Sequence, residues 1–139
     1  MWCALVESPK WYDGVCIFTS LALVVAGIVL HRAGQWVEGM ILILSGVSSV
    51  AHRLHRLLDT MVPALFVFDL VFALMAGLVL KGLIRRHSCT WTKCLSVTTT
   101  VLMVMSWGVS RFNPLCSYCL HSVAHVIGVV VITSLLRQA

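Results

Sequence analysis

The sequence predicts an all-α protein: a polytopic transmembrane bundle of about five helical spans that form a single domain over residues 1–139. Of the 139 residues, 60% are hydrophobic and only 11% are charged, and the mean hydropathy is +0.98. A soluble domain of this length cannot hide so much apolar surface in one core, so the bilayer must act as the solvent. Backbone groups in a bilayer have to satisfy their own hydrogen bonds, which makes helices the expected element.

The first two spans are expected at about residues 15–30 and 36–52. Trp11 and Tyr12 precede the first apolar run, where amphipathic aromatic rings favour the headgroup level of a membrane. The polar break at residues 31–35 then separates the two runs. Each run is close to the length of about 20 residues that a helix needs to cross a bilayer.

The remaining spans are expected at about residues 61–81, 91–110 and 118–136. Pro63 suits the first turn of a helix, because its missing N–H would be unpaired there anyway. Asp59 or Thr60 can cap that helix. The fourth span is rich in serine and threonine, and the turn at residues 111–114 ends it.

Alternating crossings decide which polar residues share a face of the membrane. The end of the second span, the start of the third and the start of the fifth fall on the face of the N-terminus. Four polar side chains then lie on that face at similar depth: His52, Asp59, His121 and His125. This placement requires the fourth span to cross.

The basic residues predict the orientation. The face opposite the N-terminus carries more of them, namely Arg32, Lys81, Arg85, Arg86, Lys93 and Arg137. This excess favours a cytosolic C-terminus, with the polar cluster facing the lumen or the exterior, in an endomembrane (endoplasmic reticulum or Golgi) or the plasma membrane. The net charge of +5 is spread over loops, so it indicates headgroup contact rather than nucleic-acid binding. Arg53, His55 and Arg56 are expected to form a basic interfacial loop that reaches lipid phosphates.

Two short motifs carry the expected chemistry. Ser48 and His52 are four residues apart at the end of the second span, and His121 and His125 have the same spacing in the fifth. Residues at i and i+4 lie on the same helix face. Three histidines that leave a fourth position for water are a common catalytic zinc site, in which zinc lowers the pKa of the water to about 7. Asp59 could accept the proton of that water.

These residues resemble the alkaline ceramidase and adiponectin-receptor superfamily of membrane zinc hydrolases, in shortened form, because that family has seven spans. The resemblance implies that His52, His121 and His125 bind Zn²⁺ and that Ser48 and Asp59 assist. It further implies hydrolysis of a lipid amide or ester, as in ceramide, with zinc-bound water as the nucleophile. A membrane lipid is then the expected substrate. A homo-oligomer is a further expectation, because a second copy would complete a smaller lipid cavity.

Two other functions stay open from the residues alone. Cys116-x-x-Cys119 at the head of a span is the spacing of a thiol–disulfide site, similar to vitamin K epoxide reductase and its bacterial kin. That chemistry needs a second pair, for which Cys3 and Cys16 are the candidates. A non-catalytic membrane adaptor or receptor-like protein with a structural zinc site is the other alternative.

Asp69 rivals Asp59 for the carboxylate role. It lies ten positions further along the chain, which is about 15 Å deeper in a helix. Ionisable groups inside spans are costly and are usually functional or paired. Asp59 is preferred because it lies level with His52. His121 and His125 could also simply hydrogen-bond neighbouring helices.

Overall fold

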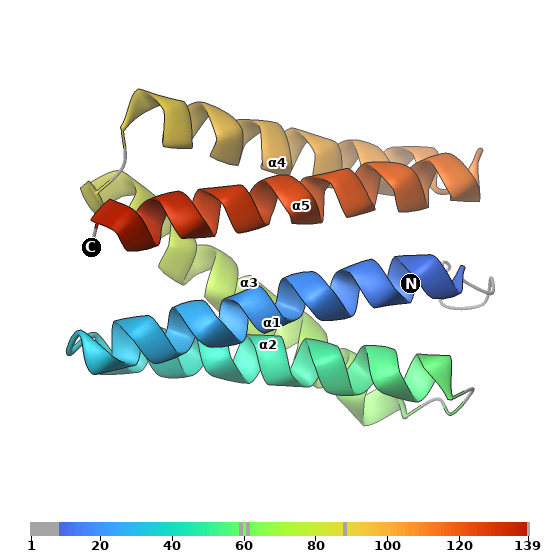
Figure 1. Ribbon diagram of the computed structural model, residues 1–139. Coiled ribbons are helices and arrows are strands. Elements are labelled where there is room, and N and C mark those ends of the chain that lie inside the picture. Colours follow the sequence, from blue (N-terminus) through green and yellow to red (C-terminus); the bar gives the residue numbers. More distant parts are fainter. Residues whose placement is uncertain (1–8, 59, 61, 88, 139) are drawn as a thin grey trace.

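The computed structural model describes residues 9–58, 60, 62–87 and 89–138. Five helices account for nearly all of them: α1 (Lys10–Arg32), α2 (Trp36–Leu57), α3 (Pro63–His87), α4 (Thr90–Val109) and α5 (Pro114–Gln138). Helices α1, α2, α4 and α5 run along an elongated bundle, and α3 crosses it obliquely (Figure 1). The predicted all-α fold is confirmed. Four helices, α1, α2, α3 and α5, are long and apolar enough to cross a membrane, so the chain is an integral membrane protein.

Helix α4 has the length of a span but carries more polar side chains. Three of its hydroxyls are satisfied locally, since Thr98, Thr99 and Thr100 each donate to the carbonyl four residues earlier. Two further bonds reach α5: Thr92 Oγ1 lies 2.8 Å from Ser134 Oγ, and Ser117 donates to the Ser106 carbonyl at 2.7 Å. The helix runs the length of the bundle beside α5 (Figure 1).

The helices extend beyond the expected spans. Pro63 is the first residue of α3, as predicted. Helix α2 continues past His52 for more than a turn, so Arg53 and Arg56 belong to a helix rather than to a loop. Helix α5 begins at Pro114, where the Asn113 side chain accepts a hydrogen bond from a first-turn N–H at 3.2 Å.

Glycines let α1 and α2 approach closely. A Cβ atom on Gly39 would lie 2.6 Å from the Gly27 carbonyl oxygen, and one on Gly46 would lie 2.7 Å from the Ser20 carbonyl oxygen. Small residues of this kind allow backbones to pack in a membrane, where helix contact depends on van der Waals fit. These contacts hold the second half of α1 against the first half of α2 and continue to the middle of both helices, next to the polar residues described below.

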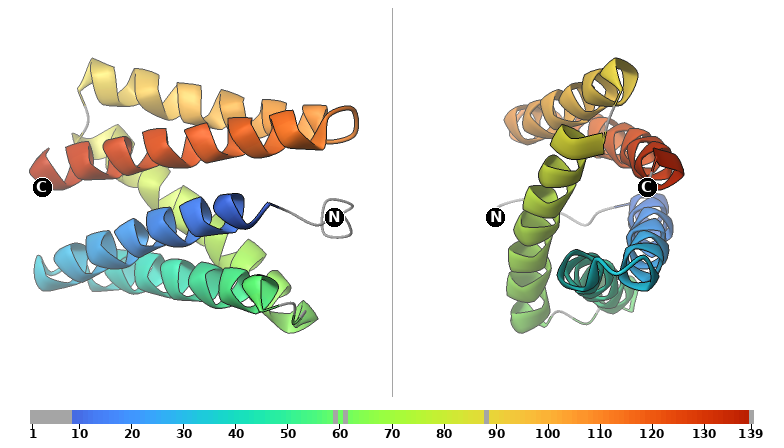
Figure 2. Two further views of the ribbon diagram at one scale, coloured as in Figure 1. Left: turned by 45° about the vertical axis from the view of Figure 1, so that its right-hand side comes forward. Right: turned by 90° about the vertical axis from the view of Figure 1, so that its left-hand side faces the viewer.

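The other helices complete the bundle around this pair. Helix α5 packs on α1 and α4, whereas α3 packs mainly on α2 and makes only a small contact with α5. The end-on view in Figure 2 shows α3 on the opposite side of the bundle from α1. The start of α1, the end of α2, and the starts of α3 and α5 lie at the same end of the bundle (Figure 1). That is the shared face that alternating crossings predict.

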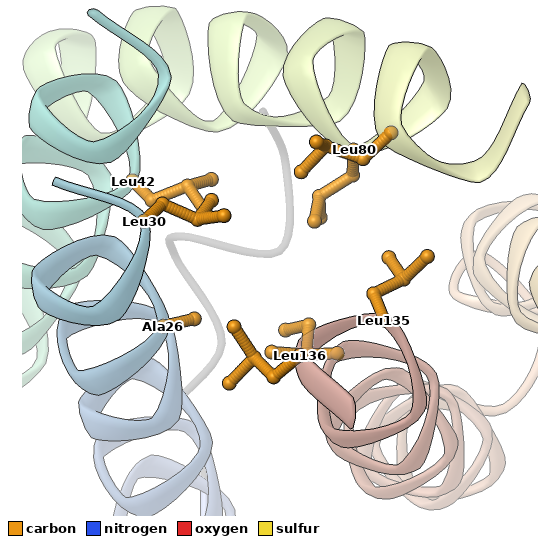
Figure 3. Close-up of a pocket in the computed structure, with 8 residues that line it drawn as sticks. Ala26, Leu30, Leu42, Leu80, Leu135 and Leu136 are labelled. Carbon is orange, nitrogen blue, oxygen red and sulfur yellow. The ribbon is translucent and has the colours of Figure 1, made fainter. Parts of the chain in front are cut away.

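The core toward the opposite end of the bundle is apolar. Its core comprises Ala26, Leu30, Leu42, Ala76, Leu83, Val131, Ile132 and Leu135. A pocket lies in this region, and its labelled side chains point inward from α1, α2, α3 and α5 (Figure 3). The bundle thus has one polar end and one hydrocarbon-lined end.

Candidate metal centre

Three metal-capable side chains meet between α1 and α5 at the polar end. The ligand atoms of Cys16, His121 and His125 all lie within 4.8 Å of one another. Cys16 is fully buried, and the two histidines are half-buried. The i, i+4 spacing on α5 places both imidazoles on one helix face, and α1 presents the thiol to that face.

Thr19 fixes the orientation of His125. The Thr19 hydroxyl lies 2.8 Å from His125 Nδ1 and also faces the carbonyls of Val15 and Cys16 at 3.0 and 3.1 Å. A hydroxyl has one proton, which Thr19 donates to these carbonyls, so it accepts a hydrogen bond from Nδ1–H. The Nε2 lone pair of His125 is thereby left for a metal, because the bond at one ring nitrogen sets the tautomer.

The donor set fits a zinc ion. His121 Nε2 and His125 Nε2 lie 2.9 Å apart, facing each other. In tetrahedral zinc sites, Zn–N distances of about 2.0–2.1 Å place nitrogen ligands roughly 3.3 Å apart and a sulfur about 3.6 Å from each. The nitrogens are thus already close to that spacing, and the longest ligand separation of 4.8 Å would contract by roughly 1 Å. One thiolate and two imidazoles are also ligands that zinc accepts.

A charged cluster borders the centre. Arg53 on α2 donates to the Asp13 carboxylate at 3.1 Å, and Arg56 Nε lies 3.9 Å from the same oxygen. The Arg53 guanidinium also lies over the Tyr12 ring, 4.9 Å from its centroid. The Tyr12 ring in turn packs in a T-shaped arrangement with the His121 ring, with ring centroids 5.6 Å apart. Arg53 and Arg56 were expected to reach lipid phosphates from a loop, but the longer α2 directs both toward the bundle interior.

A second set of polar side chains links three helices beside the centre. Ser20 on α1 lies 3.0 Å from Ser49 on α2, and its hydroxyl is 2.6 Å from the Cys16 carbonyl. Ser49 also interacts with the Asp69 carboxyl of α3. Asp69, which had no evident partner in the sequence, therefore joins the polar end of the bundle.

The other predicted site residues take different positions. His52 is buried near Phe66, with ring centroids 5.6 Å apart, and is not among the three grouped ligands. Ser48 donates to the Ser45 carbonyl of its own helix at 3.1 Å. Asp59 lies outside the described residues. The structure thus brings together His121 and His125 with Cys16 in the place that His52 was expected to take.

The cysteine pair of the redox alternative lies in the first turns of α5. Cys116 is half-buried and Cys119 is exposed, and both are free thiols. Cys3 lies outside the described residues. Cys16, its proposed companion, is the thiol of the metal-capable group.

No protein-family model, curated protein or solved structure matches the chain. The chemistry of the centre therefore rests on its own residues.

Cys16 is the ligand candidate that the motifs did not indicate. It lies about a hundred positions before His121 and belongs to neither motif. A weaker signal was present, because polar residues recur at helical spacing through the first apolar run: Tyr12, Asp13, Cys16, Thr19 and Ser20. All five are buried, so this stripe faces the bundle interior.

Proposed function

We propose that this protein is a membrane-embedded, zinc-dependent hydrolase of a lipid amide or ester. The observation that carries the proposal is the group of Cys16, His121 and His125, whose ligand atoms lie within 4.8 Å of one another. Three protein ligands leave a fourth position open, as in catalytic zinc sites, whereas structural sites use four. The resemblance of the two motifs, Ser48-x-x-x-His52 and His121-x-x-x-His125, to the ceramidase superfamily suggests the lipid substrate.

The chain's own residues have separate tasks in this proposal. Cys16, His121 and His125 would hold the ion, and Thr19 orients the His125 ring. Zinc bound there would supply a Lewis acid and would lower the pKa of water to about 7. The group lies between helices that are long and apolar enough to cross a membrane, which supports a substrate that enters from the bilayer.

A carboxylate is needed to accept a proton. Asp59 is the residue expected from the resemblance, with Ser48 as its helper. Asp69 is a second candidate, because its carboxyl interacts with Ser49, which belongs to the polar network beside Cys16. Asp13 is less suitable, since its carboxylate is already bound by Arg53.

The first test is the metal content of the detergent-purified full chain, measured by mass spectrometry. We expect about one zinc per chain, as in sites with three protein ligands. Cys16→Ala and His121→Ala should each lose it. His52→Ala and Cys119→Ala are matched controls at the same end of the bundle and should keep it. Loss in His52→Ala with retention in Cys16→Ala would replace the proposed ligand set by the one that the motifs indicated.

The second test is turnover of a ceramide with a labelled acyl chain, followed as release of the fatty acid. The zinc-loaded protein should release it, and Cys16→Ala should not. Asp59→Asn and Asp69→Asn separate the two candidate carboxylates, because only the proton acceptor should abolish release while keeping the zinc. Zinc retention without turnover of amide or ester lipids would favour the adaptor alternative, and absence of zinc from the folded protein would end the hydrolase proposal.

A further inference from the structure

Tyr12 lies at the junction between the charged cluster and the metal-capable group. It is one helical turn before Cys16, and only 5% of its surface is exposed. Its ring packs between Tyr118, at a centroid distance of 4.7 Å, and the edge of His121. Nothing in the proposed hydrolysis uses this side chain, yet it contacts residues on three helices.

The hydrogen-bond directions at the Tyr12 hydroxyl are determined by its neighbours. Arg53 Nη2 lies 3.4 Å from the phenol oxygen, and a guanidinium can only donate. The phenol oxygen therefore accepts this bond, and its own proton is available for another group. Cys16 lies four residues further along α1, on the same helix face, and belongs to the same buried cluster as Tyr12 and Tyr118.

The ion pair with Asp13 determines how Arg53 acts on the Tyr12 hydroxyl. The Asp13 carboxylate, which is 3.1 Å from Arg53, offsets the charge of the guanidinium. Arg53 thus acts on Tyr12 as a fixed hydrogen-bond donor, rather than as an unbalanced cation that would repel a metal ion. Because its side chain is only 13% exposed, the guanidinium has little freedom to turn elsewhere.

We infer that Tyr12 is a positioning residue for the metal centre: its hydroxyl, held by Arg53, donates a hydrogen bond to the Cys16 thiolate. The inference rests on the proposed function, since it requires Cys16 to be a ligand. The bond directs the sulfur toward His121 and His125. It also draws electron density from the thiolate, which leaves the bound ion a stronger Lewis acid.

Co²⁺ titration of the full chain in detergent tests the inference, because thiolate-to-cobalt charge transfer gives an absorption band that reports on the sulfur. Tyr12→Phe keeps the ring and removes the hydroxyl. We expect Co²⁺ affinity to fall about 10- to 100-fold, as for loss of other outer hydrogen bonds to a ligand. The band should move to longer wavelength, because an unbonded thiolate gives up its electron more easily.

Two further variants separate positioning from packing. Tyr118→Phe removes a hydroxyl from the ring that packs on Tyr12, and it should leave affinity and band unchanged. Arg53→Lys keeps the charge but loses the fork that reaches both Asp13 and Tyr12, and it should shift both readouts in the direction of Tyr12→Phe. Thermal unfolding of the metal-free forms monitors the fold.

The outcomes distinguish this inference from the proposed function. Cobalt binding by the wild type with an unchanged band and affinity in Tyr12→Phe would overturn the role of Tyr12 and leave the metal centre intact. Equal effects of Tyr12→Phe and Tyr118→Phe would also overturn it, since packing would then explain both. A wild type that binds neither Co²⁺ nor Zn²⁺ would overturn the centre itself, and the inference with it.

Discussion

Asp13 and Arg53 form an ion pair that is almost closed to solvent. Their charged atoms are 3.1 Å apart, and the two side chains are 4% and 13% exposed. Removing charges from water costs several kcal/mol per ion, so such a pair persists only when each charge keeps its partner. The pair joins the first turns of α1 to the last turns of α2, next to Tyr12 and the metal-capable group.

Asp13→Asn should destabilise the protein by about 3–5 kcal/mol, because it leaves Arg53 buried without its counter-charge. Thermal unfolding in detergent, followed by circular dichroism, measures the change. Glu38→Gln is the control, since the Glu38–Arg86 contact is 3.8 Å long and more exposed, at 29% and 58%. The control should cost less than about 1 kcal/mol. Equal losses of unfolding free energy in the two variants would show that the buried ion pair contributes no more to stability than the exposed one.

The α1–α2 pair depends on backbone contact more than on side-chain interdigitation. Gly27 and Gly39 face each other, and the Cβ position of each lies 2.6 Å from the carbonyl oxygen of the other. Gly46 repeats this contact beside Ser20. The register of these glycines sets Ser20 opposite Ser49 and so fixes the polar network at the end of the bundle.

Gly39→Ala should lower the unfolding free energy by about 1–3 kcal/mol, the usual cost of forcing extra atoms into a packed contact. The added methyl group would meet backbone atoms of Gly27 and His31, which cannot turn aside. Gly77→Ala on α3 is the matched control, because a Cβ there has nothing within 4 Å. It should be neutral or stabilise the helix by up to about 1 kcal/mol. Thermal unfolding in detergent measures both changes. A Gly39→Ala variant as stable as the wild type would contradict the close approach of α1 and α2.

The path of α4 decides whether the polar end of the bundle exists at all. Helices α3 and α4 join at one end of the bundle, and α4 and α5 join at the other (Figure 1). His121 and His125 reach the level of Cys16 only because α4 runs the full length between these joints. Two hydrogen bonds join α4 to α5, one between the Thr92 and Ser134 hydroxyls and one from the Ser117 hydroxyl to the Ser106 carbonyl.

Cys89 and an Arg111→Cys thiol should therefore react with a membrane-impermeant maleimide from opposite sides of a sealed membrane. Cys89 is exposed where α4 begins, and the Thr92 hydroxyl that bonds its sulfur lowers the pKa of the thiol. More of it is thiolate at neutral pH, which favours labelling. Labelling before and after permeabilisation, with the other cysteines replaced by serine, gives the sidedness. Protection of both thiols on the same side would mean that α4 does not cross.

The sequence by itself determined the helices, the membrane as their solvent, and the common face of His121 and His125. Each of these follows from local composition or from the fixed spacing of residues along a helix. Pro63 as the first residue of α3 is a further case, because proline is tolerated in the first turn of a helix and disrupts its interior.

Only the tertiary structure decided that Cys16 joins the two histidines and that Arg53 turns inward to Asp13. Both contacts join residues far apart in the chain, and they depend on how closely α1 approaches α2 and α5. A motif records spacing within one helix, whereas the rotation of one helix against another is set by packing over its whole length. That rotation places Cys16 rather than His52 beside His121 and His125.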